Sequence, residues 1–199
     1  MAVFRLCDRP NSMVQTSERV LSLDEFLAQP ETKPASELIN GQIVQKPMPQ
    51  GQHSYLQLEL AALINGALRP PKIARAGTEL RCTFGDRSIV PDIAVFTWEH
   101  IPRDPNGRVS NVFNHAPDWM IEILSPGQSS VRPTKNILHC LAYGGEMGWL
   151  IEPEDLTVLV YTPDRGTVCL DQPNDQLLVP EFAHDLDLTI QDLLDCLLD

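Results

Sequence analysis

The chain has 199 residues, of which 43% are hydrophobic, and a formal net charge of −12 at pH 7. This length predicts one domain with a buried core. No apolar run approaches the roughly 20 residues of a membrane-spanning helix, and we expect no signal peptide at the start. Contacts from Lys and Arg to phosphate supply most non-specific affinity for nucleic acid. The acidic charge therefore argues against a general nucleic-acid binder unless the few basic residues cluster.

The five cysteines are scattered along the chain, and none shows a CxxC or Cys/His metal-binding spacing. Such a pattern is typical of reduced thiols in a cytoplasmic protein. We therefore expect a cytoplasmic location and no disulfide framework.

The N-terminal half predicts two helices and a hairpin. Ser22 and Glu25 have the spacing of a capping box at the start of a helix. Asn40-Gly41 is a typical hairpin turn. The predicted elements are a loose arm over residues 1–20, a short helix over 22–29, a hairpin over 37–44 and an amphipathic helix over 52–68.

The rest of the chain alternates strands with one helix. Pro133 suits the first turn of that helix, and Gly144-Gly145 suits its end. The predicted elements are strands over 72–84 and 88–96 joined at 85–86, a long polar connection over 99–117, a strand over 118–124, a helix over 132–143, strands over 149–151, 157–161, 167–170 and 176–179, and a helix over 188–198. This order predicts an α/β fold over residues 21–199, with a mixed β-sheet flanked by helices and additional β-hairpins.

Two predicted strands each contain or begin with a carboxylate. Glu122 lies within the apolar run from Trp119 to Leu124. Burying an unpaired ionised carboxylate there would cost about several kcal/mol of folding free energy. Asp92 opens the apolar strand that follows Pro91. Because side chains alternate along a strand, the two acids converge if these strands are neighbours. Two carboxylates that close predict a hard divalent cation, Mg²⁺ or Mn²⁺, between them.

Lys135 is the candidate third member of this group. It lies in the first turns of the predicted helix after the Glu122 strand, and its long stem is expected to return towards Glu122. An ammonium there would orient a water or offset charge in the transition state. Asp118 shares the face of Glu122 and is ranked lower, because its position after a loop predicts a solvated strand end.

These motifs resemble the Uma2 family, also called domain of unknown function 820, of the PD-(D/E)XK restriction-endonuclease-like superfamily. The matching residues, in order, are Glu37-Leu-Ile-Asn-Gly41, His53, Pro91-Asp92, Glu122-Ile-Leu-Ser-Pro126, Lys135 and Gly148-Trp149-Leu-Ile-Glu-Pro153. The resemblance covers residues 22–198 and implies a restriction-endonuclease-like fold. The family's members are abundant in cyanobacteria.

One position departs from the superfamily pattern. The usual pattern places Lys at position 124, where this chain has Leu124, and members of this family carry a Lys in the following helix instead. Lys135 is assigned that role. Counting back from Gly148-Trp149, however, the family's Lys falls nearer Asn136, and one residue turns a helical side chain by about 100°.

The resemblance implies a metal-dependent endonuclease acting on nucleic acid, DNA foremost. Asp92 and Glu122 are then the metal ligands and, with Lys135, the catalytic residues. Glu37, His53 and Gln128 are candidate supporting residues; each also has a structural reading as a hairpin ion pair, a helix-start residue or a loop residue. A catalytically inactive nuclease fold that acts as a binding or scaffold module is the alternative, and a hydrolase of small phosphate esters uses the same residues. A homodimer and no membrane partner are expected.

Overall fold

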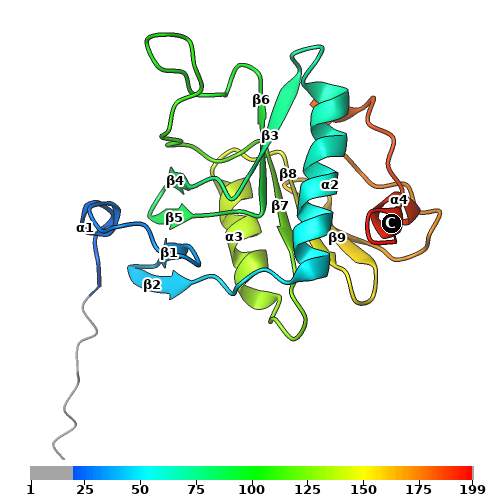
Figure 1. Ribbon diagram of the computed structural model, residues 1–199, viewed down its shortest axis with the longest axis horizontal. Coiled ribbons are helices and arrows are strands. Elements are labelled where there is room, and N and C mark those ends of the chain that lie inside the picture. Colours follow the sequence, from blue (N-terminus) through cyan, green and yellow to red (C-terminus); the bar gives the residue numbers. More distant parts are fainter. Residues whose placement is uncertain (1–19, 199) are drawn as a thin grey trace, which may run out of the picture.

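The structure is a computed structural model that describes residues 20–198, so the expected arm over residues 1–20 lies outside it except for Val20. A six-stranded sheet forms the middle layer of the fold (Figure 1). One face packs against α2 (Gly51–Leu68), and the other packs against α3 (Val131–Ala142). The two faces build separate apolar cores, which fixes every strand residue to one layer or the other.

The large sheet is mixed, as the sequence predicts. Its strand order is β10-β9-β8-β7-β6-β3. The neighbours β7 and β8 are parallel, and every other adjacent pair is antiparallel. The strands are β3 (Ala74–Thr78), β6 (Ile93–Thr97), β7 (Trp119–Ile123), β8 (Met147–Glu152), β9 (Thr157–Thr162) and β10 (Gly166–Leu170).

A second, four-stranded sheet has the order β2-β1-β5-β4. Its strands are β1 (Ser36–Ile39), β2 (Gln42–Gln45), β4 (Cys82–Phe84) and β5 (Arg87–Ile89). The predicted hairpin between β1 and β2 is confirmed, with both turn residues left-handed at φ 52° for Asn40 and 74° for Gly41.

The two long strands predicted over 72–84 and 88–96 are wrong in extent, because each one divides between the two sheets. The outgoing strand breaks at Glu79, whose φ of 52° bends the chain. The returning strand breaks at Pro91, which has no N–H for a ladder. β3 therefore pairs with β6 in the large sheet, while β4 pairs with β5 in the small one. This crossing places Asp92 at the junction of the two sheets.

The remaining elements are short. α1 (Leu23–Leu27) and α4 (Ile190–Asp195) both begin with capping boxes, the second at Thr189 and Asp192. The helix predicted over 188–198 is thus shorter at both ends. The strand predicted over 176–179 is wrong: the segment makes one isolated bridge, from Gln176 to Thr189, and its Leu178 carbonyl accepts a hydrogen bond from the Trp149 indole. A 3₁₀ helix, η1 (Glu181–Ala183), follows.

No helix within residues 20–198 is long and apolar enough to span a bilayer. The four cysteines in this part of the chain are all free thiols, as the scattered spacing predicts.

Candidate active site

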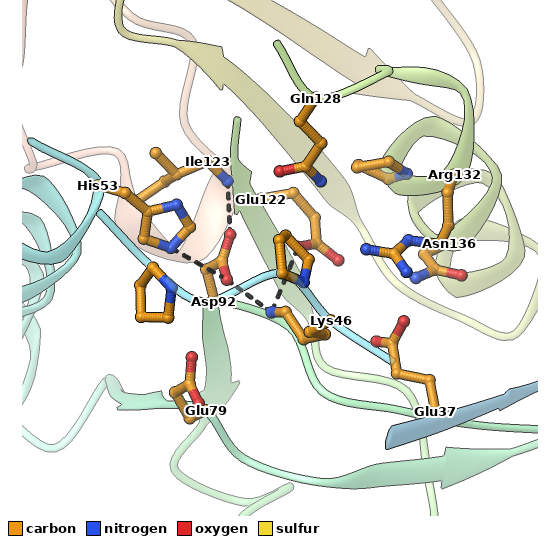
Figure 2. Close-up of a pocket in the computed structure, with 13 residues that line it drawn as sticks. Glu37, Lys46, His53, Glu79, Asp92, Glu122, Ile123, Gln128, Arg132 and Asn136 are labelled. Carbon is orange, nitrogen blue, oxygen red and sulfur yellow. Dashed lines mark hydrogen bonds and ion pairs between the residues drawn. The ribbon is translucent and has the colours of Figure 1, made fainter. Parts of the chain in front are cut away.

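The antiparallel register of β6 and β7 brings the two strand acids together. Ile93 lies opposite Ile121, so Asp92, one residue before β6, faces Glu122 on β7. Both side chains lie on the face of the sheet that α3 covers and line one cavity (Figure 2). Asp92 is 2% exposed and Glu122 is 4% exposed. The convergence that strand alternation predicts is therefore present.

Lys46 supplies the cation of this cavity, and the sequence reasoning missed it. The residue follows β2 directly, and its side chain enters between the two acids. Its Nζ lies 2.6 Å from Asp92 Oδ1 and 4.0 Å from Glu122 Oε2, and it donates a 2.7 Å hydrogen bond to the Val90 carbonyl. Burial alone would lower the pKa of Lys46, but the Glu122 and Asp92 carboxylates outweigh it and raise the pKa above its usual value. Lys46 is therefore protonated at neutral pH.

The two acids differ in how readily they ionise. Burial raises the pKa of Asp92, but the Lys46 ammonium and His53 outweigh it and bring the pKa down to about 2. Asp92 Oδ2 also accepts a 2.7 Å hydrogen bond from the Ile123 backbone N–H. For Glu122, burial raises the pKa well above its ordinary value, Lys46 offsets this only in part, and the Asp92 and Glu37 carboxylates raise it further. One fixed carboxylate thus lies beside one that resists ionisation.

Glu37, on β1, also lines this cavity and is 1% exposed. Its Oε1 accepts a 2.9 Å hydrogen bond from the Val90 backbone N–H, rather than pairing with a base across its hairpin. Burial raises the pKa of Glu37. The site therefore contains three buried carboxyl groups around one ammonium.

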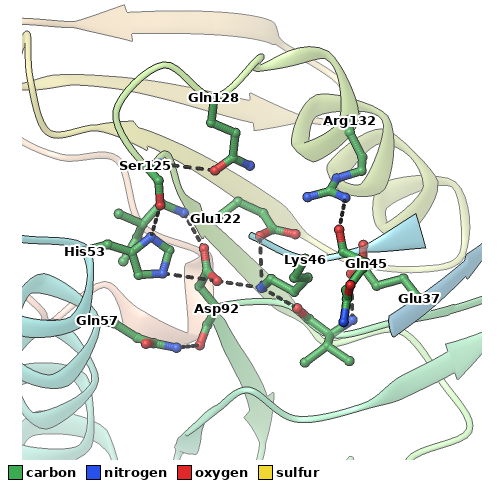
Figure 3. Close-up of polar contacts among 12 residues, drawn as sticks. Glu37, Gln45, Lys46, His53, Gln57, Asp92, Glu122, Ser125, Gln128 and Arg132 are labelled. Atoms are coloured by element: carbon green, nitrogen blue, oxygen red, sulfur yellow. Dashed lines mark hydrogen bonds and ion pairs between the residues drawn. The ribbon is translucent and has the colours of Figure 1, made fainter. Parts of the chain in front are cut away.

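His53 lies beside Asp92, and Gln128 lies beyond Glu122 (Figure 3). His53, in the first turn of α2, has Nε2 3.3 Å from Asp92 Oδ1 and Nδ1 3.4 Å from Ser125 Oγ. Gln128 accepts a 3.1 Å hydrogen bond from the Ser125 backbone N–H and lines the same cavity. Gln57 donates to the Asp92 carbonyl at 2.7 Å. His53 is thus the one of these residues that contacts the Asp92 carboxylate, whereas Gln57 fixes the Asp92 backbone and Gln128 fixes the backbone at Ser125.

The expected approach of Lys135 to Glu122 is wrong. Lys135 is exposed on α3 and lines a different cavity, whereas Asn136 is 2% exposed and lines the cavity of the acids. One residue of helix rotation, about 100°, separates these two directions. The only sequence signal for Lys46 is its position between the predicted hairpin over 37–44 and Pro47, which is weak evidence for a site.

The donor set around Lys46 is made of oxygen atoms, which hard divalent cations prefer. It consists of Asp92 Oδ1, the Val90 carbonyl and, further away, Glu122 Oε2. The cavity itself measures about 20 Å³, close to the space of one water. Within residues 20–198, no group of three or more His, Cys, Asp or Glu residues is arranged to hold a metal. The chemistry of the oxygens fits a hard cation, and Lys46 takes the central position among them.

A mixed sheet between helices thus brings two buried acids together on neighbouring strands, and the comparisons with known proteins place this arrangement in a nuclease family. A family model described as "Putative restriction endonuclease" matches residues 23–191, and the chain belongs to this family, Uma2. A crystal structure described as "a putative nuclease belonging to DUF820", from Anabaena variabilis, is 57% identical and has a TM-score of 0.88. The match covers 89% of this chain and 99% of that one. No curated protein matches the chain.

Proposed function

We propose that the protein is a metal-dependent endonuclease that hydrolyses phosphodiester bonds of nucleic acid, DNA foremost, at the Asp92–Glu122 cavity. The observation that carries this proposal is the meeting of two buried strand acids with a protonated lysine 2.6 Å from one of them. Perturbed carboxyl groups concentrated in one cavity are typical of active sites. The family match and the nuclease-like neighbour support the same reaction class.

Asp92 and Glu122 would hold Mg²⁺ or Mn²⁺, which lowers the pKa of a bound water and polarises a phosphate. Lys46 takes the role that the sequence pattern assigns to Lys135: its ammonium offsets the negative charge that develops on the phosphate. His53 keeps the Asp92 carboxylate oriented through its 3.3 Å contact. Lys46 already donates to Asp92 Oδ1 at 2.6 Å, so a cation held by Asp92 would compete with the ammonium for this carboxylate.

The test is a cleavage panel with Mg²⁺ or Mn²⁺ on duplex DNA, single-stranded DNA, RNA and small phosphate esters. Wild type, Asp92→Ala and the control Asp118→Asn are compared. We expect divalent-dependent cleavage of a nucleic acid that is lost in Asp92→Ala and kept in Asp118→Asn. Cleavage that survives in Asp92→Ala would contradict the proposal. Activity confined to small esters would support the esterase alternative, and a wholly inactive wild type would support the binding-module alternative.

The homodimer and the cytoplasmic location stay predictions. The outward face of α2 is the surface we expect to pair, because Tyr55, Leu58 and Leu63 are all exposed there. Light scattering coupled to size exclusion measures the oligomeric state directly. A Leu58→Glu variant should shift a dimer to monomer, because it places two like charges across the interface.

A further inference from the structure

A second cavity opens beside the active site, between the β1–β2 hairpin and the first half of α3. Its volume is about 270 Å³. Arg132 and Asn136 line both this cavity and that of the acids, so the two adjoin. Figure 3 shows Arg132, whose guanidinium donates to the Gln45 carbonyl at 3.1 Å. We call this second cavity the side groove; its lining residues are Ile39, Asn40, Gln42, Val44, Ser129, Val131, Arg132, Lys135 and Asn136.

The side groove is basic in a strongly acidic protein. Arg132 and Lys135 line it, and no Asp or Glu does, although the chain has a net charge of −12. Arg87 lies next to it and donates to the Lys135 carbonyl at 3.1 Å and to Asn136 Oδ1 at 3.4 Å. Such local excess charge attracts anions to one place on the surface.

The cations in and beside the side groove make no close ion pair, although the Arg132 charge offsets part of the rise that burial causes in the pKa of Glu37 across the adjoining cavity. Among residues 20–198, no ion pair within 4.0 Å involves Arg87, Arg132 or Lys135. By contrast, Arg81, directly before β4, pairs with Glu31 at 2.7 Å. The neutral oxygens around Arg87 position its guanidinium without cancelling its charge. A solvated surface lysine would explain Lys135 alone, but it does not explain why three cations without a close ion pair gather beside the acids.

We propose that the side groove holds the sugar–phosphate backbone of the nucleic acid on one side of the scissile phosphate. Lys135 and Arg132 contact phosphates there, and the Asn and Gln side chains that share the groove can donate to phosphate oxygens. This inference rests on the proposed function, because the strand must pass from the side groove into the cavity of Asp92 and Glu122. Lys135 is then a substrate-positioning residue that acts in binding, separately from the chemistry at Lys46.

The test measures binding of fluorescein-labelled DNA by anisotropy over a series of KCl concentrations, with EDTA present so that no cleavage occurs. Wild type is compared with Lys135→Gln on a duplex and on a single strand. The control is Arg165→Gln, which removes the same charge from an exposed turn between β9 and β10, at the end of the sheet opposite Glu122. Each lost phosphate contact should reduce the slope of log K against log salt by about 0.9 for duplex and about 0.7 for single-stranded DNA.

We expect Lys135→Gln to weaken binding and flatten the salt dependence, and Arg165→Gln to leave both unchanged. Equal effects of the two variants, or no binding by wild type, would overturn the proposal. A cleavage assay on the same proteins separates this result from the proposed function. If Lys135→Gln binds and cleaves DNA like wild type, the proposed binding role of the side groove is wrong, but the proposed nuclease activity is not affected. If wild type binds DNA through Lys135 but cleaves no substrate, the proposed nuclease activity is wrong, but the binding role of the side groove is not affected.

Discussion

The β6–β7 pair has a buried aspartate at each end, and the two carboxylates have different kinds of partner. At one end, Asp118 receives hydrogen bonds from the Thr97 backbone N–H at 2.7 Å and from Thr97 Oγ1 at 3.0 Å, and it contacts His100 Nδ1 at 2.6 Å. At the other end, Asp92 shares one lysine with Glu122, whose carboxylate lies 4.0 Å from the ammonium.

This difference separates Asp118, whose contacts are structural, from Asp92, which we propose to be functional. Asp118 is 3% exposed, so the expectation of a solvated strand end is wrong. Its partner His100 belongs to the long loop after β6, and the contact fastens that loop to the sheet. The Asp92 end gathers three buried carboxyl groups around one ammonium, and perturbed carboxyl groups concentrated in this way are typical of active sites.

The largest effect is expected from Glu122→Gln, which keeps the shape of the side chain and removes its charge. Cleavage should fall by about 10³-fold, the order lost when a preorganised charge-stabilising group is removed. The measurement is single-turnover cleavage with Mn²⁺, with circular dichroism to confirm folding. Unchanged cleavage would show that Glu122 has no part in catalysis, and it would contradict the functional difference between the two ends of the strand pair.

Lys46→Gln should slow cleavage by about 10²-fold, because it removes one group that offsets transition-state charge. The same variant should bind Mn²⁺ more tightly than wild type, since the ammonium no longer competes for Asp92 Oδ1. Lys135→Gln is the matched control and should keep its kcat. A normal kcat in Lys46→Gln together with a low kcat in Lys135→Gln would show that Lys135 on α3, and not Lys46, is the catalytic lysine.

Asp118→Asn should destabilise the protein by about 1–3 kcal/mol, the usual cost of leaving a buried donor or acceptor unpaired. Its cleavage rate per folded molecule should match wild type. Urea unfolding with an activity assay measures both quantities. A loss of activity larger than the loss of folded protein would mean that the Asp118 end also contributes to chemistry.

The smallest effect concerns the pH dependence of stability in metal-free protein. The folded-state pKa of Asp92, about 2, lies below its ordinary value of 3.8, so its stabilisation is present above 3.8 and is lost as pH falls towards 2. The raised pKa of Glu122 has the opposite sign: stability is retained below its ordinary 4.5 and declines as pH rises through the folded-state value. Glu122→Gln should therefore flatten the decline above pH 4.5 in urea unfolding. A residual decline from Glu37, whose pKa is also raised, should remain. An unchanged decline in Glu122→Gln would contradict this assignment.

Local patterns predict the acids of the site but not its lysine. Strand alternation places Asp92 and Glu122 on one face, and an antiparallel neighbour is enough to bring them together. Lys46 reaches them only because the small sheet folds its hairpin against the crossing at Pro91. That contact joins residues 46 positions apart, so no periodic pattern in the sequence indicates it.

The errors in the predicted elements have the same origin. The hairpin turns and helix caps are read from a few adjacent residues, and both hairpins are confirmed. A strand that changes sheets at Glu79 looks continuous in sequence, because apolar alternation resumes after the bend. Similarly, the one-residue difference between Lys135 and Asn136 depends on where α3 starts, and start points are the least certain part of a helix prediction.

Calorimetric titration with Mn²⁺ tests directly whether Asp92 and Glu122 hold a divalent cation. The proteins compared are wild type, the double variant Asp92→Ala/Glu122→Ala and Asp118→Asn. We predict that Mn²⁺ binds to wild type and to Asp118→Asn, and that the double variant loses this binding. Equal binding by the double variant would show that any cation sits elsewhere, and it would contradict a metal-dependent site at the Asp92 end of the strand pair.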